Sequence, residues 1–413
     1  MWSPIMSLNE DKDLVKEFTD RIYNVLIKHN EEISPFNVYM GRGGIYLYLL
    51  FYKLSNKENI ENLDEILEAI TNSASLYKIE NYQQLTFYAE IGWLICFLYD
   101  KKNIDLDLNA YLGDIDESLY ESMIFLLSKN EYGLVNGAIS IGQYFHYRYI
   151  LGHESSLKSL EVFVEYLSKI SNEKERTMDW ISIVDYGLLK KGNNLGIAHG
   201  MPGIILFLEK LYKLNIRKKM IENILIKTTN FLLSQKHSLA THKSYFYDVN
   251  SEAPQTGRDS RLAWCYGDLS VGYSLYKVSR IEGMERPAVE HEALDILMNT
   301  VTRTDLKEIS VVDGGLCHGT SGLAHIYNRL YQDSKIDIFK DAALFWYKET
   351  FKMSKYNNEF VGFGIPYYLS EKEKEINREY NTSFLTGIAG IGLSLLSAIY
   401  DVEPEWDNYL LLS

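Results

Sequence analysis

Apolar stretches follow glycine or other small residues at seven places along the chain. Each stretch is rich in Leu, Ile and Tyr, and a pair of small residues three positions apart lies beside it. Because glycine permits tight turns and close contact between helices, each place is predicted to be a turn followed by a helix. The seven segments are 40–52, 88–99, 132–147, 195–212, 264–276, 316–331 and 384–400.

The turns recur at intervals that can each hold two helices. Between them, stretches such as 223–233 and 342–351 place apolar residues at helical spacing with polar residues on the other face, which is typical of helices with one exposed side. The predicted repeat is an outer helix, a glycine turn and an inner helix covered by its neighbours. Seven such hairpins closed on themselves predict an all-α fold, an α/α toroid or double helical barrel, with a single domain over 1–413. An open array of helix pairs is the structural alternative.

Three segments depart from the simple repeat. The stretches 157–194 and 235–262 are longer than the other connections and are expected to carry loops or short strands. The second is polar and bears Pro and Gly, which predicts a long loop at the rim of the fold. The segment 384–400 is apolar but falls short of the roughly 20 residues of a membrane span, so a buried helix is predicted there and no membrane span.

Composition and charge narrow the class of partners. The formal net charge is −14, which argues against nucleic acid because phosphate binding requires clustered Lys and Arg. The N-terminal residues have neither the basic start nor the apolar core of a signal peptide. With only three cysteines, no disulfide framework is expected, and a cytoplasmic location is the default expectation.

Two of the three cysteines occupy equivalent places in the repeat. Cys265 and the pair Cys317-His318 directly precede glycine turns, whereas Cys96 lies within an apolar helical stretch. Equivalent turns of neighbouring hairpins should bring Cys265, Cys317 and His318 together, and thiolate and imidazole ligands favour a single Zn2+ ion. Three protein ligands leave the fourth position open for catalysis. The alternative is that these are buried structural residues, which is the interpretation adopted for Cys96.

Two further residues are candidates for the chemistry. His199 occupies the place in its repeat that His318 occupies in another, so its imidazole is predicted to face the same centre and to act as an acid or base, unless it is a structural histidine. Arg261 lies four residues before Cys265 and could hold a carboxylate or an enolate, although an arginine in a loop is ordinarily solvated.

The segments that begin at Trp264 (WCYG), Leu316 (LCHGTSG) and Gly196 (GIAHGMPG) together resemble the lanthionine synthetase C (LanC) family. The resemblance implies a zinc-dependent lanthipeptide cyclase. In this family zinc activates a peptide cysteine thiol, which adds to dehydroalanine or dehydrobutyrine and forms a thioether ring. It implies that Cys265, Cys317 and His318 hold zinc, that His199 protonates the enolate and that Arg261 supports the site. We expect Tyr266 and Trp264, which flank Cys265, to contact the substrate.

One position departs from the family pattern. The resemblance implies an aspartate in the third repeat, where this chain has Gly133. Glu131, Asp259 or Asp268 are candidates to replace it. The other options are that His199 acts without a carboxylate and that activity is reduced. The expected partners are a dehydrated precursor peptide and a lanthipeptide dehydratase.

Other functions stay open at this stage. The chain could be a non-cyclising LanC-like protein that binds thiols or serves as a scaffold in a peptide-modification complex. A zinc prenyltransferase or a glycosidase on a helical toroid is a further alternative, but paired catalytic carboxylates and an Asp-rich metal pattern are not evident in the sequence.

Overall fold

The structure is a computed structural model that describes residues 2–6, 9–29, 37–58, 82–101, 106–185, 190–239, 243–246, 249–251, 259–367, 377–379 and 381–413. The chain divides into two units. The central unit is Lys78–Ile309, and the terminal unit combines Met1–Tyr77 with Ser310–Ser413.

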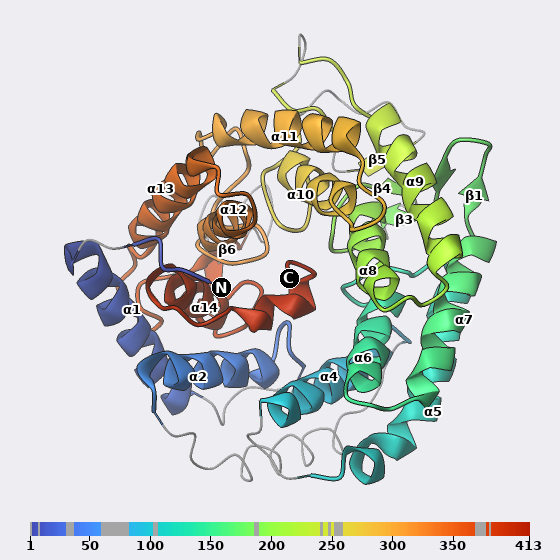
Figure 1. Cartoon of the computed structure of the whole chain (residues 1–413). Helices are drawn as coiled ribbons and strands as arrows, with labels where there is room; N and C mark the ends of the chain where they lie inside the picture. Colours follow the sequence, from blue (N-terminus) through green and yellow to red (C-terminus); the bar gives the residue numbers. More distant parts are fainter. Residues whose placement is uncertain are drawn as a thin grey trace. The chain divides into compact units, whose positions relative to one another are not determined.

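In the central unit, inner helices pack side by side and outer helices cover them (Figure 1). Contacts run from α4 to α6, from α6 to α8 and from α8 to α10, while α5, α7, α9 and α11 each pack on inner helices. The inner helices are α4 Thr86–Asp100, α6 Ala138–Ile150, α8 Met201–Lys213 and α10 Asp268–Ser279, and η1 Tyr82–Leu85 precedes α4. The outer helices are α5 Leu108–Ser128, α7 Ser155–Lys169, α9 Lys218–Ser234 and α11 Pro287–Val301.

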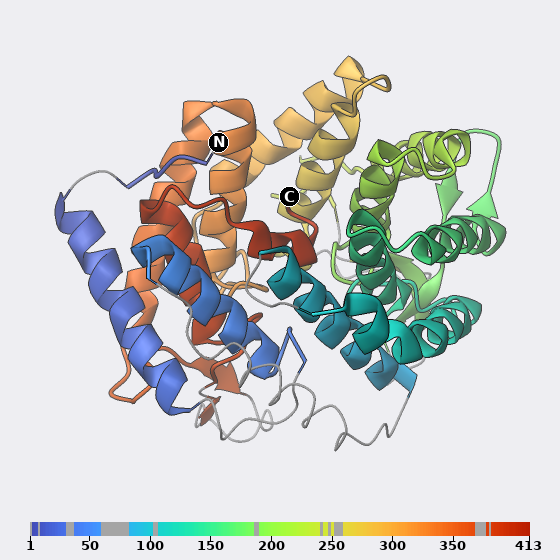
Figure 2. The same cartoon turned by 60° about the horizontal axis from the view of Figure 1, so that its bottom comes forward.

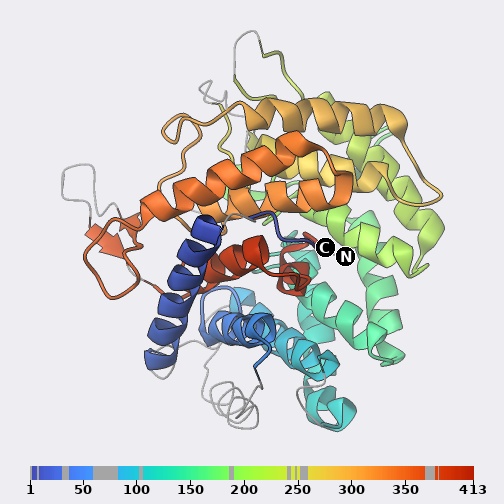
Figure 3. The same cartoon turned by 60° about the vertical axis from the view of Figure 1, so that its left-hand side comes forward.

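The terminal unit repeats this arrangement around α14. Helix α14 contacts α1, α2 and α12 (Figure 2), and α13 lies along α12 (Figure 3). Its helices are α1 Asn9–Lys28, α2 Arg42–Asn56, α12 Thr320–Ser334, α13 Asp337–Met353, α14 Ile388–Ile399 and η2 Glu405–Leu410. The predicted outer stretches 223–233 and 342–351 lie within α9 and α13, which bury one face each.

The inner helices are apolar on nearly all sides because neighbours surround them. Every residue of α14 is buried, which confirms the buried helix predicted at 384–400. Among the described residues, no helix is long and apolar enough to cross a membrane. Glycine permits the close packing: a Cβ at Gly142 would lie 2.6 Å from the ring of Phe207, and one at Gly392 would lie 2.3 Å from the ring of Tyr48.

Short strands occupy the long connections. In the central unit, β1 Asn172–Glu173 pairs with β2 Met178–Asp179, and β3 Ser182–Asp185, β4 Lys190–Asn194 and β5 Val249–Ser251 form an antiparallel sheet in the order β3-β4-β5. In the terminal unit β6 Ile365–Tyr367 pairs with β7 Asn377–Glu379. Within the segment 157–194, where loops or short strands were expected, the described residues from 172 onward include the short strands β1 to β4. The residues up to Lys169 belong to α7, which was not expected there. Much of the predicted rim loop 235–262 lies outside the described residues.

Three of the glycine turns share one backbone hydrogen bond. In these turns the N–H of the first helical residue donates to the carbonyl seven residues earlier, from Ala138 to Glu131, from Thr320 to Asp313 and from Ile388 to Asn381. Neighbouring turns are joined by backbone hydrogen bonds at the residue two before the capping glycine. These run from Val135 to Ala198 in the central unit, and from Cys317 to Leu385 and from Leu385 to Tyr39 in the terminal unit. Side chains at equivalent turn positions are thereby held in the same register.

Candidate functional site

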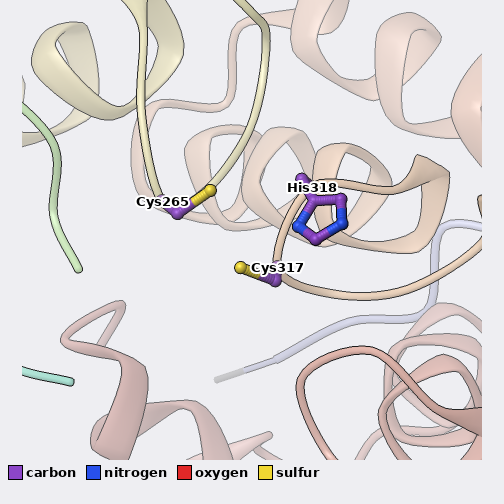
Figure 4. A group of neighbouring side chains, drawn as sticks. All are labelled: Cys265, Cys317 and His318. Atoms are coloured by element: carbon purple, nitrogen blue, oxygen red, sulfur yellow. The ribbon is translucent and has the colours of Figure 1, made fainter. Parts of the chain in front are cut away.

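Cys265, Cys317 and His318 form a group that could hold a metal ion (Figure 4). One ligand atom from each residue lies within 4.8 Å of the others. Cys265 is buried, with 5% of its surface exposed, whereas Cys317 and His318 are partly exposed. Two thiols and one imidazole are ligands that zinc favours, and a three-ligand set leaves room for a fourth ligand.

The turn that carries Cys265 depends on two glycines. Gly267 has a φ of 91°, in the left-handed region, and a Cβ there would lie 1.9 Å from the carbonyl oxygen of Arg261. A Cβ at Gly196 would lie 2.0 Å from the carbonyl oxygen of Cys265. Only glycine fits these places without displacement of the backbone, so the turn 194–200 packs directly against the turn 261–267.

This packing brings His199 and Tyr266 together. Their ring centroids lie 6.4 Å apart. The buried Asn194 connects the two turns, because its Oδ1 accepts the N–H of Gly196 at 3.0 Å while its Nδ2 donates to the hydroxyl of Tyr266 at 3.1 Å. The Tyr266 hydroxyl thus accepts a hydrogen bond from Asn194, which fixes the position of the phenol oxygen beside the histidine turn.

The surroundings of His199 favour the neutral imidazole. Burial lowers the pKa of His199 below its ordinary value of 6.5, and a hydrogen bond with the backbone of Val135 acts in the opposite direction. A carboxylate beside the ring would raise that pKa. At neutral pH the ring can therefore accept a proton and pass it on.

A cavity of about 300 Å³ opens beside this pair. Its lining combines residues from the turns with residues of β3, and it includes His199 and Tyr266. The lining residues are Asn130, Glu131, Tyr132, Gly133, Val135, Asn136, Ser182, Ile183, Val184, Asn194, His199 and Tyr266. The cavity can accept a polar group of modest size close to an acid or base.

The structure distinguishes the candidate carboxylates. Asp268 is fully buried and accepts the backbone N–H groups of Tyr245 and Phe246, and Asp259 accepts those of Lys243 and Ser244. These carboxylates anchor loop backbone. Glu131, by contrast, lines the cavity that holds His199.

Gly133 leaves little space for the family's aspartate. A Cβ at this position would lie 3.0 Å from the Cα and 3.4 Å from the Nδ1 of His199. Any side chain there would press on the histidine turn.

The remaining predicted residues are placed as follows. Arg261 is half-buried in the turn before Cys265. Trp264 is 1% exposed, so in this conformation it is a core residue and offers almost no surface to a substrate. Cys96 is fully buried, and burial raises the pKa of its thiol to about 12, as suits the structural cysteine proposed from the sequence.

Two residues of the site were not found by sequence reasoning. In the terminal unit, Asp313 lies with its Oδ2 atom 3.4 Å from the Nε2 atom of His318. Asp313 and Asn194 both lie five residues before the histidine of their turns. Alignment of the turns on their capping glycines would have revealed this shared position.

The hairpin repeat, the glycine turns and the Cys-Cys-His group define the class of protein, and the family comparison gives the same answer. The model of the family described as "Lanthionine synthetase C-like protein" matches residues 32–411 of this chain. The chain therefore belongs to this family. Among solved structures it is similar to "Nisin cyclase", at 17% sequence identity with a TM-score of 0.75, covering 96% of this chain and 97% of that one. The predicted all-α toroid fold is thereby confirmed. No curated protein matches the sequence.

Proposed function

We propose that this protein is a zinc-dependent lanthipeptide cyclase, which joins peptide cysteine thiols to dehydroalanine or dehydrobutyrine residues of the same peptide. The observation that carries the proposal is the Cys265, Cys317 and His318 group, whose ligand atoms lie within 4.8 Å of one another. Membership in the LanC-like family supports it.

The donor set fits zinc, and Cys265, Cys317 and His318 would hold it. A free thiol has a pKa of about 8.5 and is mostly protonated at neutral pH. Bound zinc would lower the pKa of a substrate thiol and so increase the fraction present as the nucleophilic thiolate. The Asp313 carboxylate near His318 is the kind of partner that metal-bound histidines commonly have.

His199 carries the proton in this proposal. Its neutral imidazole accepts the proton of the substrate thiol. The sulfur then forms a bond to the β-carbon of the dehydroamino acid, and the electron pair of the carbon–carbon double bond moves toward the carbonyl group. His199 returns the proton to the α-carbon, so that the sum is addition of S–H across the double bond.

Tyr266 and Arg261 stabilise the developing negative charge. Asn194 donates to the Tyr266 oxygen at 3.1 Å and so positions the phenol, whose O–H is the group proposed to donate to the enolate oxygen. Arg261 offers a permanent positive charge in the turn that carries Cys265.

The substrate is a dehydrated precursor peptide, and a dehydratase is the partner that would supply it. The three free cysteines fit a reducing compartment such as the cytoplasm.

The test is a reaction of the purified protein with a dehydrated peptide that carries one cysteine. Loss of the alkylatable thiol with no change in peptide mass is expected, because cyclisation is an isomerisation. An enzyme-free incubation sets the background of spontaneous closure, and zinc content is measured on the same sample. A thiol count that never falls below this background, over a panel of dehydrated peptides, would remove the proposal.

A second candidate is a non-cyclising LanC-like protein that binds thiols or serves as a scaffold. Gly133 favours it, because the carboxylate implied by the family resemblance is missing there. Stoichiometric zinc without turnover, together with binding of a thiol such as glutathione or of a dehydratase, is the result that supports this alternative.

A further inference from the structure

Asp313 is held firmly by its own turn. Its Oδ1 atom accepts the backbone N–H of Gly315 at 2.7 Å, and its side chain is 2% exposed. The turn closes tightly around the carboxylate, since a Cβ at Gly319 would lie 2.5 Å from Oδ1. The second oxygen, Oδ2, is therefore fixed in direction before any ligand binds.

That second oxygen faces the histidine that follows in the turn. Oδ2 lies 3.4 Å from Nε2 of His318 and, within the part of the chain that the structure describes, has no hydrogen-bond partner. A buried acceptor without a partner is costly. At 3.4 Å the two atoms do not form a hydrogen bond in this conformation, but an N–H at Nε2 of His318 would be attracted to this oxygen, whereas a lone pair at Nε2 would repel it.

We infer that Asp313 is a positioning residue that keeps the proton of neutral His318 on Nε2 and so presents Nδ1 as the metal ligand. The inference rests on the proposed function for the identity of the metal. A histidine ligand is stronger when its second nitrogen donates to a carboxylate, because the ring is oriented and its basicity is raised. Asp313 thus prepares His318 for the metal and does not touch the metal or the substrate.

The turn that carries His199 shows what an amide does at this position. Asn194 Oδ1 accepts the N–H of Gly196, as Asp313 Oδ1 accepts that of Gly315, and Asn381 accepts the N–H of Ser383 in the same way at 3.1 Å. An amide therefore supports this turn as well as a carboxylate does. The negative charge of Asp313 is not needed for the fold of the turn.

The first test compares zinc affinity in Asp313→Asn and in a matched control, Asp305→Asn. Exposed Asp305 also accepts backbone N–H groups in its own turn, at Lys307 and Glu308, so the control removes the same charge from a similar cap. We expect zinc binding, measured by competition with a chelator of known affinity, to weaken about 10- to 100-fold in Asp313→Asn and to be unchanged in Asp305→Asn. Equal affinities for wild type and Asp313→Asn would overturn the inference.

The second test needs no metal. In the metal-free protein, ¹⁵N NMR of the histidine rings at a pH where His318 is neutral should show His318 with a protonated Nε2, its signals being assigned by their loss in His318→Gln. Asp313→Asn should shift this tautomer toward a mixture while the melting temperature stays near that of wild type. A His318 ring protonated on Nδ1 in wild type would refute the inference even if cyclase activity is found. Conversely, an Nε2 proton that depends on Asp313 supports it even if no cyclisation occurs.

Discussion

The turns 194–200 and 313–319 share a side-chain cap and a capping glycine but have different neighbours. Both end in a histidine followed by the glycine that caps an inner helix. In both, a polar side chain five residues before the histidine accepts the N–H of a glycine two residues later. In the first turn that side chain is Asn194, and it donates to Tyr266; in the second it is Asp313, and it faces the histidine of its own turn.

The exchange of an amide, at Asn194, for a carboxylate, at Asp313, gives the histidines of the two turns different surroundings. In the turn with the neutral amide, burial lowers the pKa of His199, as suits a group that accepts and releases a proton. A carboxylate beside His318 can orient the ring and strengthen it as a ligand. The same turn can therefore serve proton transfer or metal binding, according to the residue at this position.

Replacement of a proposed ligand should have the largest effect. Cys317→Ala is expected to weaken zinc binding by more than the roughly 100-fold that loss of a supporting residue can cost, and to abolish cyclisation with it. Metal content by mass spectrometry and thiol alkylation of the peptide are the two measurements. Cys96→Ala is the control: it removes a buried thiol from α4 and should lower stability but retain zinc. Full metal content in Cys317→Ala would show that the two turns do not differ as proposed.

Removal of the proton carrier should affect rate and leave the metal in place. His199→Gln is expected to lower kcat about 10²- to 10⁴-fold, the usual contribution of a general acid or base. Zinc content should be unchanged, because the metal ligands proposed here lie in other turns. His291→Gln, on the exposed face of α11, is the matched control. A simultaneous loss of zinc would place His199 in the metal site and remove the distinction between the two turns.

Exchange of the amide for a carboxylate tests the comparison most directly. In Asn194→Asp the Tyr266 hydroxyl must donate to the new carboxylate, so its proton no longer reaches the substrate, and the nearby charge raises the pKa of His199. We expect a lower kcat and a loss of roughly 1–3 kcal/mol of stability from the poorly solvated charge. Asn381→Asp, at the same turn position of the terminal unit, is the control for the turn itself. An equal loss of kcat in both variants would mean that turn stability, and not the tyrosine, is responsible.

Introduction of the family's acid at Gly133 should have a smaller effect. The Cβ of Gly133→Asp would lie 3.0 Å from the Cα of His199, so the histidine turn must move, at a cost of about 1–3 kcal/mol for an overpacked site. Thermal unfolding and kcat/KM measure the result. Gly113→Asp, at a position on α5 where a Cβ meets nothing within 4 Å, is the control. A gain in activity for Gly133→Asp would show that the missing carboxylate limits this enzyme.

The lowered pKa of His199 predicts the smallest effect, on stability in mild acid. The unfolded chain binds a proton at this residue near pH 6.5, but the folded chain binds it only at lower pH. As the pH falls below about 6.5, the unfolded state is therefore favoured. His199→Gln should lose less stability than wild type between neutral pH and pH 5 in urea unfolding. Parallel pH profiles of the two proteins would contradict the assignment of a lowered pKa.

The sequence was sufficient to predict the helical repeat, because each turn and each apolar helix is marked by residues that are close together in the chain. The seven predicted inner segments all overlap inner helices, and in six of them the capping glycine was visible as a small residue before an apolar run. Helix α4 is the exception, because it begins after Leu85 and the predicted turn residues Ala89 and Gly92 lie inside it. The equivalence of Cys265, Cys317, His318 and His199 followed from their distance to those glycines. Strand pairing at 172–194 was not specified, since the strands are short and β4 also pairs with β5, which lies more than 50 residues further along the chain.

Tertiary structure alone decided which partner each turn residue meets. Nothing local to Asn194 indicates that its amide reaches a tyrosine 72 positions away, and nothing local to Trp264 indicates that neighbours cover it completely. Likewise, the sequence alone indicated that an acidic residue is missing at Gly133. The structure shows that the turn of His199 fills the space beside this position. Hydrophobic periodicity and glycine spacing fix where the turns are, but the roles of their side chains arise from contacts between turns that are distant in sequence.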